Sequence, residues 1–291
     1  KQQKKWRKLL TTDFSYYEKI KVPPPTWCPE CRLIRRLIFY NKRTLYKRTC
    51  TLCGNEMFSM YDASSAFTVY CNKCWWSDAW DPFSYGKEYD FSKPFFLQMQ
   101  ELSTQAPQMA LGRDESTLVN SNYVNAAGNL KDCYLVFLAD YVENSYYCDT
   151  IIHSKDCIDC LSVNQCEQCY ESINISKCFR VFYSDHCEDC YDVLFSKNLT
   201  SCSNCIGCAN LRNKQYCIFN QQYTREGYEA KIKDFGLSSF AHIFNMKSRA
   251  KEFLQKYPDK YFHGRHNVNV SGDYINYSKT TLHSFFVDNA E

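Results

Sequence analysis

The middle of the chain mixes apolar and polar residues without the spacing of a long helix. Residues 145–217 are rich in Tyr, Phe, Val, Ile, Ser, Asn and Asp and poor in Ala. No long apolar stripe with helical spacing crosses this segment. That pattern favours short strands joined by turns, because β-branched and aromatic residues fit strands while Asn, Asp and Ser fit turns.

The cysteines of the same segment recur at a stride of 21 residues. The motif Cys166-Glu-Gln-Cys-Tyr-Glu171 returns as Cys187-Glu-Asp-Cys-Tyr-Asp192. A fixed period of this length is typical of stacked repeats. The stride predicts three columns: Cys148, Cys169 and Cys190; Cys166, Cys187 and Cys208; and Cys157 with Cys178.

We therefore expect a mainly β protein built around a right-handed β-solenoid of about 21 residues per coil. Each coil would contain three strands of roughly 4–5 residues, and successive coils would stack about 4.8 Å apart. The right hand is the default for parallel connections. The aligned thiols would either fill the narrow interior as small buried side chains or bind metal and form redox pairs. Buried packing is favoured, since thiols that point the same way suit neither a disulfide nor a tetrahedral metal.

The composition divides the chain into six segments. Helices are expected at residues 1–12, Phe95–Leu102, Arg225–Phe235 and from Ser238 or Ser239 to about Tyr257, with Gly236 ending the third. We expect the chain to continue beyond Glu291. The segments are a basic arm (1–25), a zinc-binding module (26–92), a connector and cap (93–130), the solenoid (131–222), a helical hairpin insertion (223–262) and a resumed, truncated solenoid (263–291).

Three C-x2-C pairs near the N-terminus predict zinc, in a zinc ribbon or treble clef. We favour Cys50, Cys53, Cys71 and Cys74 as one site, with Gly54 allowing a tight turn. A hairpin of Glu56–Tyr61 with Phe67–Tyr70 and a short helix from Cys71 into Trp75–Trp80 would support it. The remaining pair, Cys28 and Cys31, would bind a second metal with further ligands or replace one of the other pairs. A disulfide-clipped module is the alternative.

The net charge of +3 hides a strong asymmetry. The first 50 residues contain 14 Lys and Arg against three Asp and Glu, a charge of +11, and the remainder carries −8. Aromatic rings interleave with these cations, as on surfaces that hold phosphates and stack bases. The alternative is a solvated basic face, with Leu33, Ile34, Leu37 and Ile38 packed inward. The nucleic-acid-binding candidates are Lys4, Lys5, Arg7, Lys8, Arg32, Arg35, Arg36, Lys42, Arg43, Tyr46, Lys47 and Arg48.

Other classes of protein have less support. No run of 18 apolar residues is present, and the N-terminus has no apolar signal core. The 19 cysteines, many of them in C-x2-C pairs, indicate a reducing compartment such as the cytoplasm. No nucleophile elbow, phosphate-binding loop, dinucleotide fingerprint or H-E-x-x-H motif occurs. His263-Gly-Arg-His266 is interpreted as a turn. A carbohydrate-active face would need carboxylates such as Asp156, Asp159, Glu188, Asp189 and Asp192.

Four motifs resemble those of an uncharacterised group of Cys-rich bacterial proteins from candidate phyla. They are Cys28-Pro-Glu-Cys-Arg-Leu-Ile-Arg-Arg-Leu37, Leu45-Tyr-Lys-Arg-Thr-Cys-Thr-Leu-Cys-Gly54, Val69-Tyr-Cys-Asn-Lys-Cys-Trp-Trp-Ser-Asp78 and Cys205-Ile-Gly-Cys-Ala-Asn-Leu-Arg-Asn-Lys214. The resemblance implies a zinc-binding head on a Cys-rich body and supplies no activity.

Three functions remain after these observations. We expect a non-enzymatic zinc protein whose basic module binds nucleic acid, with RNA or a ribonucleoprotein favoured and the solenoid as scaffold. A structural or protein-interaction solenoid is the second candidate, and a carbohydrate-active β-helix enzyme is the third. A membrane partner is not expected.

Overall fold

The computed structural model describes residues 17–37 and 41–290. The chain forms two compact units, Lys1–Leu111 and Gly112–Glu291. Strands outnumber helices, and the largest sheet has eight strands. The expected helix at residues 1–12 lies outside the described ranges. No helix within those ranges combines the length and the apolar character that a membrane crossing requires.

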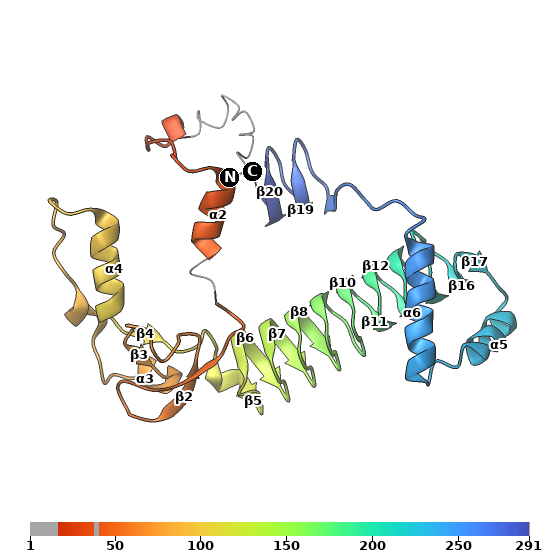
Figure 1. The fold of residues 1–291 in the computed structure, drawn as a ribbon, viewed down its shortest axis with the longest axis horizontal. Coiled ribbons are helices and arrows are strands. Elements are labelled where there is room, and N and C mark those ends of the chain that lie inside the picture. The colour runs from red at the N-terminus through yellow and green to blue at the C-terminus, as the bar shows by residue number, and fades with distance from the viewer. Residues whose placement is uncertain (1–16, 38–40, 291) are drawn as a thin grey trace, which may run out of the picture. The chain divides into compact units, whose positions relative to one another are not determined.

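The second unit contains a stack of parallel strands, called here the Cys-rich stack (residues 113–219), and the short strand β17 that follows it pairs antiparallel with β16. One sheet has the order β14-β12-β10-β9-β8-β7-β6-β5 and another β11-β13-β15-β16-β17, and Figure 1 shows the strands as successive layers. A 3₁₀ turn, η2 (Glu115–Thr117), precedes them. The strands are β5 (Leu118–Val119), β6 (Val124–Lys131), β7 (Val136–Glu143), β8 (Asp149–Lys155), β9 (Leu161–Asn164), β10 (Ile173–Ser176), β11 (Phe179–Phe182), β12 (Asp185–Glu188), β13 (Tyr191–Leu194), β14 (Lys197–Thr200), β15 (Ser203–Ile206), β16 (Gln215–Ile218) and β17 (Gln221–Gln222).

The layers repeat every 12 residues, so the predicted stride of 21 is wrong. Val124 lies beside Val136, Ile151 beside Val163, and the same offset continues through β16. Both 21 and 12 are multiples of three, and inward positions recur every third residue. A stride of 21 therefore keeps each cysteine on an inward position but assigns it to the wrong column. The observed columns include Cys148 with Cys160, Cys157 with Cys169, and Cys166, Cys178, Cys190 and Cys202.

A strict three-residue unit builds each layer. The first residue is buried in every unit from Val124 to Cys217 except those of Leu211 and Lys214, the next is extended and exposed to a varying degree, and the third has a left-handed backbone. In one such unit Cys157 is buried, Ile158 is extended and Asp159 has φ of 54°. Four of these units make one layer of 12 residues. Asn, Asp and Gly accept a positive φ most readily, which explains why Asn and Asp are abundant here.

Thirteen cysteines of the stack are buried and line its interior as free thiols. The Cys208 thiol lies 3.4 Å from the Ile206 carbonyl oxygen, and its sulfur accepts the Asn220 N–H at 3.4 Å. The Cys208 N–H in turn donates to the Ser196 hydroxyl, one layer earlier, at 3.0 Å. Thiols and hydroxyls therefore satisfy backbone groups inside the stack, and the buried-packing interpretation of the cysteines is the one that the geometry favours.

Two helices follow the stack and cover its last layers (Figure 1). They are α5 (Arg225–Phe235) and α6 (Phe240–Leu254). The first matches the prediction, and the left-handed Gly236 ends it as expected, while the second ends three residues before Tyr257. Parallel strands then resume as predicted, in β18 (Gly264–Arg265), β19 (Gly272–Asn276) and β20 (Ser284–Asp288). The stack begins earlier than the predicted residue 131, since β5 already pairs with β6.

The first unit contains the predicted metal module. Its elements are α2 (Pro29–Leu37), β1 (Tyr46–Thr49), β2 (Glu56–Ser59), β3 (Val69–Tyr70), α3 (Asn72–Trp75), the 3₁₀ turn η1 (Pro82–Tyr85), α4 (Phe95–Gln105) and β4 (Gln108–Met109). Helix α4 confirms the helix expected from Phe95 and extends past Leu102. Its role as a cap for the first coil stays a prediction.

The predicted hairpin of Glu56–Tyr61 with Phe67–Tyr70 is wrong. Strand β2 pairs antiparallel with β1, and β3 pairs in parallel with β4. The tight turn lies between β1 and β2, where the Cys50 N–H donates to the Asn55 carbonyl at 2.9 Å and the Gly54 N–H donates to the Cys50 carbonyl at 3.0 Å. Gly54 has φ of 76°, so the sequence was right about this turn and wrong about the strand that follows it.

Candidate metal centre

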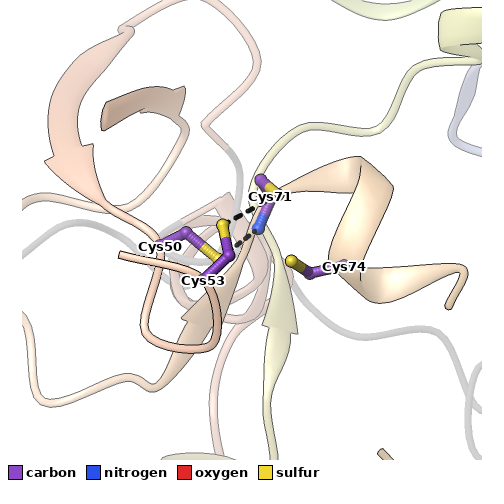
Figure 2. A group of neighbouring side chains, drawn as sticks. All are labelled: Cys50, Cys53, Cys71 and Cys74. Carbon is purple, nitrogen blue, oxygen red and sulfur yellow. Dashed lines mark hydrogen bonds between the residues drawn. The ribbon is translucent and has the colours of Figure 1, made fainter. Parts of the chain in front are cut away.

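Cys50, Cys53, Cys71 and Cys74 converge in the first unit, as predicted (Figure 2). Cys50 and Cys53 lie in the turn between β1 and β2. Cys71 is the residue before α3 and Cys74 lies within it. The helix is shorter than the one expected across Trp75–Trp80, but it begins where the sequence placed its start.

The four sulfur atoms all lie within 4.8 Å of one another. The Cys53 and Cys71 sulfurs are 4.0 Å apart. The Cys71 N–H donates to the Cys50 sulfur at 3.3 Å, which ties the two halves of the cluster together. Four soft donors at these distances could hold a metal ion. Among the residues that the structure describes, this is the one group of His, Cys, Asp and Glu side chains that lie close enough together to hold a metal ion.

The electrostatic environment differs among the four thiols. Burial acts to raise the pKa of Cys50, but N–H groups of Cys53, Cys71 and Leu52 donate to its sulfur and lower the pKa to about 7. Burial raises the pKa of Cys71 and of Cys74, and for Cys74 the hydrogen bonds that its thiol donates to neighbouring sulfurs add to the effect. The Cys50 thiol therefore ionises near neutral pH, and a bound cation would favour the thiolate form of the other three cysteines.

Buried contacts hold the second half of the cluster in place. The Asn72 side chain is buried and its amide donates to the Leu111 carbonyl at 2.9 Å. Tyr70, next to Cys71, is buried and packs edge to face with Trp80 at 5.5 Å. The Trp80 indole donates to the Trp75 carbonyl at 3.0 Å. The C-x2-C turn is therefore fixed before any ligand binds, because its flanking residues are anchored on both sides.

The third pair, Cys28 and Cys31, is not part of this cluster. It lies at the start of α2, where the Cys31 N–H donates to the Cys28 sulfur at 3.3 Å. Hydrogen bonds from the Cys31 backbone and thiol lower the pKa of Cys28. A metal role for this pair stays a prediction.

Two of the predicted nucleic-acid-binding residues make contacts with other side chains or backbone groups of the first unit. Arg48 donates to the Asp62 and Phe67 carbonyls, each at 3.1 Å, and so braces the loop between β2 and β3. Lys47 forms an exposed ion pair with Glu56 at 2.9 Å. Arg48 is therefore a weak candidate for phosphate binding, because moving its guanidinium would release that loop.

Helix α2 presents its cations differently. Arg35 and Arg36 are exposed in its last turn, and the Arg35 guanidinium lies 5.3 Å from the Trp27 ring. Arg32 donates to the Tyr17 hydroxyl at 2.8 Å. The apolar side chains Leu33, Ile34 and Leu37 are about half exposed, so the alternative in which they pack inward is not what the described residues show.

The remaining candidates divide by position. Lys42 and Tyr46 are half-buried and Arg43 is exposed, whereas Lys4, Lys5, Arg7 and Lys8 lie outside the described ranges. Lys73 and Trp76, which are not among the predicted candidates, are exposed at the Cys71–Cys74 turn. Their position, between Cys71 and Cys74 and two residues after Cys74, is the sequence signal that would add them to the candidates.

The carboxylates considered for carbohydrate chemistry do not form one face. Because of the 12-residue layer, they belong to three different sides of the stack. Asp192 pairs with Arg180 at 2.9 Å, and Glu188 pairs with Arg265. Asp189 accepts a hydrogen bond from Ser201 and Asp156 one from Asn144. These contacts are typical of structural carboxylates rather than of a catalytic pair.

The His263–His266 cluster is also a structural feature. His263 begins the resumed strands and stacks on His186 with ring centroids 4.4 Å apart, and His266 stacks on Tyr277. The predicted turn is thus part of a layer. No protein-family model, curated protein or solved structure matches this chain.

Proposed function

We propose that the protein is a non-enzymatic zinc protein whose N-terminal unit binds nucleic acid, with single-stranded RNA as the favoured ligand. The four-cysteine cluster would hold Zn²⁺. Zinc bound to four sulfurs at about 2.3 Å would set those sulfurs about 3.8 Å apart, and the Cys53–Cys71 distance of 4.0 Å is close to that value. The ion would stabilise the turn and α3 and take no part in a reaction.

The observation that carries the proposal is that α2 presents exposed arginines and that Trp27, just before the helix, is an exposed aromatic residue. Arg35 and Arg36 project from a helix that follows Trp27, in a stretch of 50 residues with a charge of +11. Guanidinium groups bind phosphates, and an exposed indole can stack on a base. Lys73 and Trp76 offer the same combination at the metal cluster.

The Cys-rich stack would serve as the scaffold of this protein. We interpret its parallel 12-residue layers as a right-handed β-solenoid, in which each layer is one turn of the chain. Its surface carboxylates are largely paired with neighbouring side chains. A rigid rod with internally satisfied charges suits a spacer or platform better than a catalytic surface.

Binding of a fluorescein-labelled, 20-nucleotide single-stranded RNA to the full chain tests the proposal. Fluorescence anisotropy at 50 and 200 mM salt would measure the Kd. If about four phosphates are contacted, the Kd should rise roughly 50-fold over that range. Replacing both exposed arginines of α2, in Arg35→Glu/Arg36→Glu, should weaken binding at least about tenfold and reduce the salt dependence.

The matched control is Lys251→Glu/Lys256→Glu, which changes the net charge equally but alters exposed residues of the second unit. It should bind RNA nearly as well as the unmodified chain. If both double variants weaken binding equally, the attraction is a property of overall charge and the α2 site is refuted. If the full chain shows no salt-dependent binding to RNA or to duplex DNA, the nucleic-acid function itself is refuted.

A further inference from the structure

A continuous apolar column extends along one side of the Cys-rich stack. Each member lies beside the residue 12 positions later, as the strand register shows. The column consists of Tyr134, Tyr146, Ile158, Tyr170, Phe182, Leu194, Ile206 and Ile218. Exposure changes sharply along it. Tyr134, Tyr146 and Ile158 are 38–39% exposed, whereas Ile206 and Ile218 are 0% and 4% exposed.

The buried end of this column is covered by the chain's own helices. Tyr228 of α5 and Met246 of α6 form one apolar cluster with Ile206 and Ile218. An ion pair marks the edge of the covered part, where Lys247 of α6 binds Glu171. The same ammonium group lies 4.1 Å from the centroid of the Tyr183 ring. This side of the stack therefore binds an amphipathic helix through apolar side chains plus one lysine held between an acid and an aromatic ring.

The uncovered end repeats the features that the helices use. Tyr147 and Asp159 lie in adjacent layers of one column, as do Glu171 and Tyr183, so an aromatic ring and a carboxylate are again neighbours. Both Tyr147 and Asp159 are exposed. A surface hollow of about 240 Å³ lies near the beginning of the column, and its lining includes Tyr134, Tyr146 and Asp132.

We propose that the uncovered column, from Tyr134 to Ile158 with Tyr147 and Asp159 beside it, is a docking surface for a basic amphipathic helix of another protein. It continues the side that α6 already occupies, and its acidic groups complement a basic helix. The partner's apolar residues would cover the tyrosines, and one lysine or arginine would lie between Tyr147 and Asp159. The carboxylates Asp132 and Asp159 would repel a phosphate backbone. This surface is therefore separate from the proposed nucleic-acid site.

The probe is a peptide that copies Ser239–Gln255 of this chain, joined by a lactam across its solvent-facing side so that it is helical in solution. Circular dichroism confirms that helicity before use. Its binding to the full chain is measured by fluorescence anisotropy. We expect saturable binding that weakens at least about tenfold in Tyr134→Ser/Tyr146→Ser. Tyr191→Ser, which alters a tyrosine that is 48% exposed on another side of the stack, is the control and should bind unchanged.

A charge reversal tests the position of the lysine. Asp159→Lys should weaken binding of the peptide, and a peptide with Lys247→Glu should regain affinity for the Asp159→Lys chain, because the ion pair is restored with opposite sign. Far-ultraviolet dichroism of each protein variant establishes that it is folded, which the exposure of the altered residues favours.

Three outcomes overturn the proposal. The first is absence of saturable binding by the helical peptide. The second is binding that is unaffected by the Tyr134/Tyr146 and Asp159 variants, which would mean that the peptide displaces α6 at its own position. The third is tyrosine-dependent binding of a soluble polysaccharide such as laminarin together with no peptide binding, which would assign the surface to a carbohydrate. None of these results depends on whether the first unit binds RNA.

Discussion

The interior hydrogen bonds of the stack predict a specific ranking of substitutions at Ser184. This side chain is buried, donates to the Phe182 carbonyl at 2.9 Å and accepts the Ser196 N–H at 3.1 Å. Ser184→Ala removes both bonds and leaves a buried N–H without its acceptor. An unsatisfied buried donor costs about 1–3 kcal/mol and the lost bond a further 0.5–1.5 kcal/mol or so. We therefore expect a loss of about 2–4 kcal/mol in the free energy of unfolding.

Ser184→Cys should be far milder, because a thiol retains a donor and an acceptor. The same column already has cysteines two layers before and two layers after, at Cys160 and Cys208. The Cys208 sulfur accepts an N–H from the next layer at 3.4 Å, as the replaced hydroxyl did. Longer and weaker bonds to sulfur should limit the loss to about 1 kcal/mol or less.

Urea unfolding followed by circular dichroism measures both values, provided that the dependence on urea is the same in all variants. Hydrogen exchange provides a local readout, since the Ser196 amide should exchange at least about tenfold faster in Ser184→Ala. Ser176→Ala, which alters a partly exposed serine of the same stack, should change stability by less than about 0.5 kcal/mol. The reasoning is refuted if Ser184→Ala is equally harmless, or if Ser184→Cys is as damaging as Ser184→Ala.

Three further predictions concern the metal cluster and the backbone. Elemental analysis should find bound zinc in the unmodified chain and little or none in Cys53→Ser. All four sulfurs bind zinc as thiolates, and the pKa of Cys50 is lowered only to about 7. In a competition titration, the apparent zinc affinity should therefore fall by roughly two to four powers of ten per pH unit below neutrality. Gly207→Ala should destabilise the chain by about 2 kcal/mol in urea, since φ is 63° and a Cβ would lie 2.6 Å from the Phe219 ring. Thr150→Asn should increase the free energy of unfolding by about 0.5–1 kcal/mol and so raise the melting temperature, because a β-branched residue there has φ of 57°.

The metal cluster was predictable because its chemistry is local. Two C-x2-C pairs and Gly54 identify two tight turns, and a metal-type cluster needs only that these turns meet. The strand pairing was not predictable in the same way. The sequence between Glu56 and Tyr70 is compatible with a hairpin, but Arg48 holds the loop at Asp62 and β3 pairs instead with β4, 39 positions along the chain. That choice depends on a distant strand.

The layer length was missed for a different reason. Cys, Ser, Val, Ile and Leu all occupy the buried position of each three-residue unit, so the repeat is invisible if only apolar residues, or only cysteines, are counted. Ser172 and Ser184 appear polar in the sequence, yet both are buried because their hydroxyls bind backbone groups. If Cys and Ser are grouped with Val, Ile and Leu, the sequence shows a period of three residues. The 12-residue layer still does not follow from that period, because it depends on the register between strands.

The nineteen cysteines thus belong to environments that the C-x2-C spacing alone does not separate. Cys157 and Cys160 have the same spacing as Cys71 and Cys74, but they occupy consecutive buried positions of one layer. In the stack, burial raises the pKa of Cys133, so this thiol remains a neutral hydrogen-bonding side chain. At the Cys71–Cys74 turn the sulfurs instead converge with those of a second turn. What distinguishes a ligand from a packing residue here is whether the backbone brings sulfurs from two turns toward one point or repeats them along a column.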